Sequence, residues 1–174
     1  MPCHETGAAM GQGTATSGND PGASSRIYLV IVDDSPESAR ALRFAARRAL
    51  RTGAAVHILA LVPRAEIVPF GSVQATLEAE AHDRAEALAQ EAACTLSGDT
   101  GLHATIAVKS GDGPQAVRQY LRDHPEVSAL VIGAAAGPSP GPLASHFAAQ
   151  AGNLPCVLMI VPGGADEARI DAVS

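Results

Sequence analysis

The fold of this 174-residue chain is decided by the stretch Ile27-Tyr28-Leu29-Val30-Ile31-Val32-Asp33-Asp34-Ser35-Pro36-Glu37. Its uninterrupted run of β-branched and aliphatic residues is typical of a strand covered on both faces, as in a parallel sheet. Ser35 offers an N-cap oxygen, Pro36 suits the first helical position, and Glu37 complements the helix dipole. The stretch therefore predicts a buried strand followed directly by a helix, which we expect to end near Arg51.

The same alternation of strand and helix continues along the rest of the chain. Apolar runs predict further strands over residues 55–62, 103–108, 128–133 and 157–161. Helical spacing and turn residues predict further helices over 77–96, 117–124 and 142–150. Without any hairpin turn between the strands, this pattern predicts an α/β fold: a single doubly wound domain with a five-stranded parallel sheet, helices on both faces, and Rossmann-like topology.

The ends of the chain differ from its middle in composition. Residues 1–25 are rich in Gly, Ser, Thr and Ala without periodicity, which predicts a disordered tail. The domain is expected over 26–162, and residues 163–174 are expected to form a flexible tail. Residues 1–6 lack the basic and apolar regions of a secretory signal, so we expect a cytoplasmic protein.

Charge and composition argue against several classes of partner. Twelve Lys and Arg against 18 Asp and Glu give a net charge of −6, so no global positive field is present to hold a nucleic acid. Aromatic residues make up 3% of the chain and tryptophan is absent, which removes the usual stacking platforms for bases. No stretch approaches the roughly 18 apolar residues that span a bilayer, so we expect no membrane contact.

Several segments together carry a resemblance to a known family. The segment 32–38 resembles the opening of universal stress proteins, and 111–114 is similar to the turn that precedes their third helix. Residues 129–133 resemble the fourth strand and first loop glycine of that family, and 154–161 resemble its last strand. The match covers 26–162. The resemblance implies an adenine-nucleotide-binding fold related to that of the adenine nucleotide alpha hydrolases. It also implies a protein that takes part in stress responses as a homodimer.

The loop that holds phosphates in this family departs from its usual pattern here. Gly133 matches the first glycine, but the next glycine position is Ala136, and the final pair of the motif corresponds to Ala144 and Ser145. Three prolines (138, 140 and 142) remove backbone N–H donors, and no Lys or Arg occurs between 125 and 168. His146 is the only side chain in that interval that could become cationic. These losses argue against tight ATP binding.

The resemblance assigns a pocket, carried over residue by residue from the matching positions. It comprises Ile31, Val32, Asp33, Leu61, Ile132, Gly133, Ala136, Ala144, Ser145 and His146. Two hypotheses follow: a regulatory module with a degenerate nucleotide site, or a conventional sensor that binds ATP or AMP with Mg²⁺. No nucleophile elbow, P-loop or His-Glu-x-x-His motif is present, so we expect no enzyme, or at most weak ATP hydrolysis. We expect no resident metal ion.

Two features leave alternatives open, and a third concerns assembly. Asp33 either accepts a hydrogen bond from adenine or ribose, as the family implies, or helps Ser35 to start the first helix. Arginines at 40, 43, 47 and 51 form a stripe on that helix, which is either a solvated face or a site for an acidic partner. The family also implies dimerisation through the last strand, Val157 to Val161. In addition, we expect a protein partner whose identity the sequence does not give.

Overall fold

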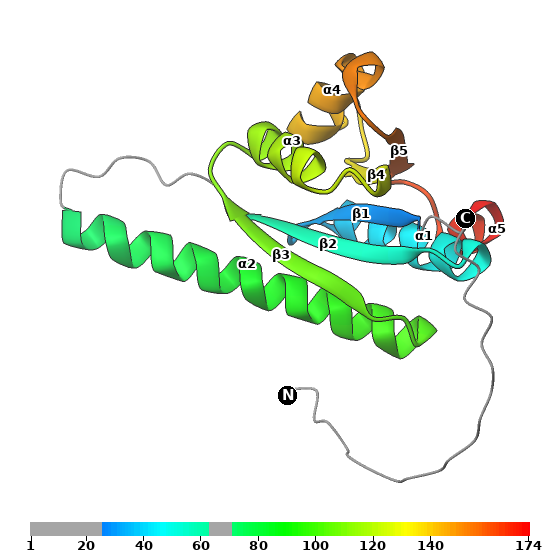
Figure 1. Ribbon diagram of the computed structural model, residues 1–174, viewed down its shortest axis with the longest axis horizontal. Helices are drawn as coiled ribbons and strands as arrows, with labels where there is room; N and C mark the ends of the chain where they lie inside the picture. The colour runs from blue at the N-terminus through cyan, green and yellow to red at the C-terminus, as the bar shows by residue number, and fades with distance from the viewer. Residues whose placement is uncertain (1–25, 63–70) are drawn as a thin grey trace, which may run out of the picture.

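The computed structural model describes residues 26–62 and 71–174, and its centre is a five-stranded sheet with every strand parallel (Figure 1). The strands are β1 (Ile27–Val32), β2 (Ala55–Val62), β3 (Ala104–Ser110), β4 (Val127–Ala134) and β5 (Val157–Pro162). Their order is β3-β2-β1-β4-β5. The predicted doubly wound α/β fold is confirmed. The expected tail over 1–25 lies outside the described residues.

The helices connect the strands in the predicted order. They are α1 (Pro36–Thr52), α2 (Gly71–Thr100), α3 (Gly113–Asp123), α4 (Pro142–Ala149), a 3₁₀ turn (Ala151–Asn153) and α5 (Glu167–Val173). The structure extends α2 beyond the predicted range at both ends. Leu77, expected on the apolar side of this helix, is 43% exposed because the amino-terminal part of α2 extends past the sheet (Figure 1).

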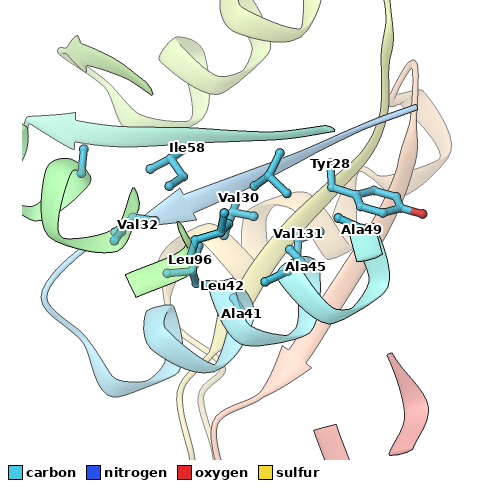
Figure 2. Close-up of a cluster of buried hydrophobic side chains, with 14 of the residues drawn as sticks. Tyr28, Val30, Val32, Ala41, Leu42, Ala45, Ala49, Ile58, Leu96 and Val131 are labelled. Atoms are coloured by element: carbon cyan, nitrogen blue, oxygen red, sulfur yellow. The ribbon is translucent and has the colours of Figure 1, made fainter. Parts of the chain in front are cut away.

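Two apolar layers cover the two faces of the sheet. Helices α1, α2 and α5 pack on one face, and α3 and α4 pack on the other (Figure 1). On the first face, Ala41, Ala45 and Ala49 of α1 are fully buried and lie toward Val30 and Val131 (Figure 2). Because alanine side chains are short, they allow the backbone of α1 to lie close to β1 and β4.

The segment after β5 is not the flexible tail that the sequence predicts. Asp166 accepts a hydrogen bond from the N–H of Arg169 at 2.7 Å and caps α5. Ile170 is only 2% exposed, inside the layer formed with α1. Seven residues alone could not hold a stable helix, so the packing of α5 against α1 supplies its stability.

The order of the strands determines where a ligand crevice can form. From β1 the chain proceeds outward to β2 and β3, and it then returns to place β4 on the other side of β1. In open α/β sheets the crevice lies at such a reversal, outside the carboxyl ends of the two strands. The residues that follow β1 and β4 are therefore the ones that decide whether a ligand can enter.

Candidate functional site

Asp33, the first residue after β1, forms hydrogen bonds within the turn that leads into α1. Its carboxylate accepts hydrogen bonds from the N–H of Ser35 at 3.0 Å and from the Ser35 hydroxyl at 2.5 Å. The N–H of Asp33 donates to the hydroxyl oxygen of Ser38 at 3.0 Å, and the N–H of Ser38 donates to Ser35 Oγ at 3.2 Å. These contacts correspond to the second interpretation of Asp33, a turn residue that helps Ser35 to cap α1.

Gly133, near the end of β4, lies directly beneath the first turn of α1. A Cβ atom built on Gly133 would be 2.3 Å from the backbone oxygen of Glu37 and 2.5 Å from its carbonyl carbon. No side chain tolerates such distances, so only glycine permits this approach. The first turn of α1 therefore occupies one side of the crevice between β1 and β4.

The loop from β4 to α4 folds back on itself at the other side of the crevice. The N–H of Ala135 donates to the carbonyl oxygen of Pro140 at 3.1 Å, which directs this donor into the loop. Gly141 precedes α4 with a φ of 91°, and it provides no side chain to cap that helix. Pro138 and Pro140 of the loop, and Pro142 at the start of α4, have no N–H to offer an anion.

What remains between these elements is a cavity of about 90 Å³. Small-molecule sites usually have volumes of roughly 300–1,000 Å³, so this cavity is smaller than a site for a whole nucleotide. Of the ten residues that the resemblance assigns to the pocket, four line the cavity: Ile31, Asp33, Gly133 and Ala144.

The other six assigned residues do not line this cavity. Val32 belongs to the opposite apolar layer, because successive side chains of a strand point to opposite faces. Leu61 and Ile132 pack in the layer beneath α3 and α4. Ala136 and Ser145 are exposed. The sixth, His146, has a different partner.

His146 lies between α4 and α3 rather than beside the cavity. Its Nε2 atom is 3.0 Å from an amino group of Arg118, which also donates to the side-chain oxygen of Gln150. Because a guanidinium only donates, a hydrogen bond between the two requires His146 Nε2 to accept. Sequence reasoning missed Arg118, because helical spacing gives no information about the neighbours of a residue on another helix.

A second titratable cluster lies near the amino ends of β2 and β4, away from the crevice. His57 Nδ1 is 2.9 Å from the Tyr120 hydroxyl, the Tyr120 and His124 rings are stacked with centroids 4.2 Å apart, and His124 Nδ1 is 3.0 Å from Glu126 Oε1. Burial lowers the pKa of His57, and the nearby His124 lowers it further. Burial also raises the pKa of Tyr120. His57 therefore stays neutral at physiological pH.

A larger concavity of about 700 Å³ lies between α1 and α2. It is lined by side chains at helical spacing on both helices and by residues 165–167. Sequence reasoning did not anticipate this groove, because each helix alone presents an ordinary boundary between its apolar and polar faces.

The arginine stripe of α1 contacts the C-terminal segment of the same chain. Arg43 forms two hydrogen bonds with the Asp171 carboxylate, at 2.9 and 2.7 Å, and lies 3.2 Å from a Glu167 oxygen. Arg40 Nε donates to the Ala165 carbonyl oxygen at 3.1 Å, and Arg47 Nε is 3.4 Å from Asp171. Arg43 and Arg47 therefore pair with acidic side chains of α5, and Arg40 is bonded to the backbone of the segment that precedes α5.

The described residues contain neither a metal-binding cluster nor a membrane-spanning helix. Within residues 26–62 and 71–174, no three His, Cys, Asp or Glu side chains are arranged to hold a metal ion. No helix in the same ranges is long and apolar enough to cross a membrane.

Comparison with known proteins gives a consistent result. Residues 25–162 match the model of the universal stress protein family. Among solved structures, universal stress protein UspA from Lactobacillus plantarum is 22% identical, with a TM-score of 0.67 over 79% of this chain and 97% of its own. No curated protein matches the sequence.

Two further similar structures contain nucleotides. The universal stress protein from Archaeoglobus fulgidus in complex with dAMP is 17% identical, with a TM-score of 0.56 over 78% of this chain and 96% of its own. A universal stress protein in complex with cAMP is 19% identical, with a TM-score of 0.56 over 80% of this chain and 98% of its own. At these identities, the likeness establishes the fold alone.

Proposed function

The chain belongs to the universal stress protein family, and from that premise we propose that it is a regulatory binding module whose nucleotide crevice is degenerate. The observation that carries the proposal is the cavity of about 90 Å³ that remains between β1 and β4. A nucleoside triphosphate needs several times that volume and several inward-pointing donors. The module would then act through contacts with other proteins rather than through ATP.

Charge around the crevice supports the same proposal. Asp33 and Asp34 place two carboxylates at the end of β1, and the carboxylate of Asp33 is already bonded to Ser35. A phosphate would bind at the amino end of α4. The guanidinium of Arg118 does not lie there, because it contacts His146 and Gln150, and Gln150 follows the carboxyl end of this helix. A triphosphate in this crevice would meet negative charge, and none of the described residues that line the cavity is a Lys or Arg that could compensate for it.

We further propose that the protein is a cytoplasmic homodimer that is joined through β5 and catalyses no reaction beyond weak ATP hydrolysis. Strand β5 pairs only with β4 among the described strands, and its Val157 and Ile160 side chains are 59% and 38% exposed. An exposed apolar edge strand favours pairing with a second copy. The unknown partner would bind elsewhere on this dimer.

A second candidate function is a sensor of nucleoside monophosphates. It is favoured by the similar structures that contain dAMP and cAMP. A monophosphate brings less charge than ATP, and it would need the loop over 135–141 to move away from α1. In that case Asp33 would leave Ser35 and accept from the adenine or the ribose.

The nucleotide content of the protein purified from cells distinguishes the two candidates. The protein is denatured with acid, and the released nucleotides are separated by chromatography and counted against protein. We expect far less than one nucleotide per ten chains. Recovery of AMP or cAMP near one per chain would support the second candidate, and recovery of ATP near one per chain would contradict the first.

A further inference from the structure

The groove between α1 and α2 has the size and shape of a ligand site. Its volume of about 700 Å³ lies within the usual range for small-molecule sites. The two helices line it with side chains three and four residues apart, such as Ala39 and Arg43 on α1 and Leu88 and Ala92 on α2. It extends over the α1 and α2 face of the sheet, whereas the cavity of the nucleotide crevice lies between β1, β4 and α4. The two meet at the end of β1, where Asp33, Ser35 and Ser38 line both.

The floor of the groove is apolar. Val32, Leu42 and Leu96 are buried beneath it, and the half-buried Leu88 stands at its side. A ligand with an apolar ring or chain would remove part of this surface from water, which favours binding by roughly 25 cal/mol per Å² of apolar area.

The rim of the groove is strongly acidic. Six carboxylates and two arginines line it, and the carboxylates are Asp33, Asp34, Glu91, Asp99, Asp166 and Glu167. Both arginines already have acceptors in the chain: Arg40 is bonded to the Ala165 carbonyl, and Arg43 is bonded to Asp171. Glu91 forms no hydrogen bond or ion pair with any residue that the structure describes. Arg43 also lies 3.2 Å from Glu167 of the same rim, and the other carboxylates leave the groove with an excess of negative formal charge.

The position of Asp99 adds an independent observation. It lies in the last turn of α2, where the helix dipole already places partial negative charge, and that turn contains no basic residue. A carboxylate at this end of a helix is unfavourable for the helix itself. Asp99 lies close enough to Arg43 to help raise the pKa of that guanidinium. A further cation bound in the groove would interact favourably with Asp99 and with the carbonyl end of the α2 dipole.

We propose that this groove binds a small organic cation, in which an ammonium or amidinium group is attached to an aromatic or alkyl body. The charged group would lie between Glu91 and Asp99, and the apolar body would cover Leu88 and Leu96. Phosphates and other anions would be repelled by the rim. A bare metal ion would leave the apolar floor uncovered, and none of the described residues are arranged to ligate one.

The test uses the fluorescent planar cation berberine and the full chain. Berberine emission rises when the dye leaves water, so a titration gives a Kd. We expect saturable binding, weakened at least about fivefold in the Glu91→Gln/Asp99→Asn double variant. The matched control is Asp83→Asn/Glu86→Gln, which removes the same charge from exposed positions of α2 outside the groove. That control should change the Kd less than about twofold.

Two further measurements keep the result interpretable. Leu88→Trp fills the groove and should abolish binding, while circular dichroism shows that the variant keeps its helices. The anionic dye 1-anilinonaphthalene-8-sulfonate should not bind. Equal weakening by both double variants, equal binding of the two dyes, or no berberine binding up to about 1 mM would each overturn the proposal. None of these outcomes depends on whether the nucleotide crevice is closed.

Discussion

Gly133 allows the first turn of α1 to lie against the end of β4. The contact is between backbone atoms, since the Glu37 carbonyl lies where a Cβ of any other residue would be. In the family, the residue at this position is a glycine of the phosphate loop. Here the same glycine also allows the first turn of α1 to approach β4 closely.

Replacing Gly133 by alanine should therefore destabilise the fold by about 1–3 kcal/mol, because α1 must move to relieve the overlap. Urea denaturation measures the change in free energy of unfolding. Gly152→Ala is the matched control, since a Cβ there meets nothing within 4 Å, and it should stay within about 0.5 kcal/mol of the wild type. If the two variants were equally stable, the contact would be absent in solution.

His57 gives the fold a pH dependence whose sign follows from its burial. The pKa of His57 is lower in the folded chain than in the unfolded chain. As pH falls through the unfolded value near 6.5, the unfolded state takes up a proton that the folded state refuses, so stability falls. The wild type should lose more in Tm between pH 8 and pH 5 than His57→Gln does. Equal losses would show that His57 carries no part of the effect.

At the scale of elements, α5 is held by side chains that lie 120 or more residues earlier in the sequence. Arg43 lowers the pKa of Asp171 through two hydrogen bonds, so this contribution is present at neutral pH and is lost only when strong acid protonates the carboxylate. Arg51 adds donors to the backbone oxygens of Asp171 and Ser174. The arginine stripe therefore fixes the end of the chain.

Asp171→Asn should loosen α5 without unfolding the domain. Hydrogen exchange followed by mass spectrometry should show faster exchange of the amides of 167–173 and unchanged exchange in β1 and β4. Arg169→Gln is the control, because no described residue bonds to its exposed guanidinium. If exchange in α5 were already at the unfolded rate in the wild type, the helix would be undocked.

The elements differ in how well the sequence predicts them, for physical reasons. Strand β2 occurs at its predicted bounds, because a buried strand between two helical layers must be a continuous apolar run. Helix α5 was missed, because its only buried apolar residue is Ile170 and its other anchors lie on α1. Within the site, the position of Asp33 directly before Ser35 was enough to suggest its role at the start of α1. The pairing of Arg118 with His146 could not be predicted, because it depends on the packing of α3 against α4.

At the scale of the whole molecule, the sheet has two free edges among its described strands, β3 and β5. We expect a dimer through β5, so Ile160→Lys should reduce the mass in sedimentation to that of a monomer. Thr105→Lys places the same charge at an exposed position of β3 and should leave the dimer intact. A monomeric wild type, or dimers in both variants, would rule out this interface.

Isothermal titration of the purified protein with ATP in the presence of Mg²⁺ most directly tests the proposal that the crevice does not admit ATP. ADP, AMP and adenosine are titrated in parallel, and Asp33→Ala serves as the site control. The closed crevice predicts no measurable ATP binding up to about 1 mM, where binding is worth only about 4 kcal/mol. Low-micromolar ATP binding that Asp33→Ala abolishes would contradict it and would identify the protein as a nucleotide sensor.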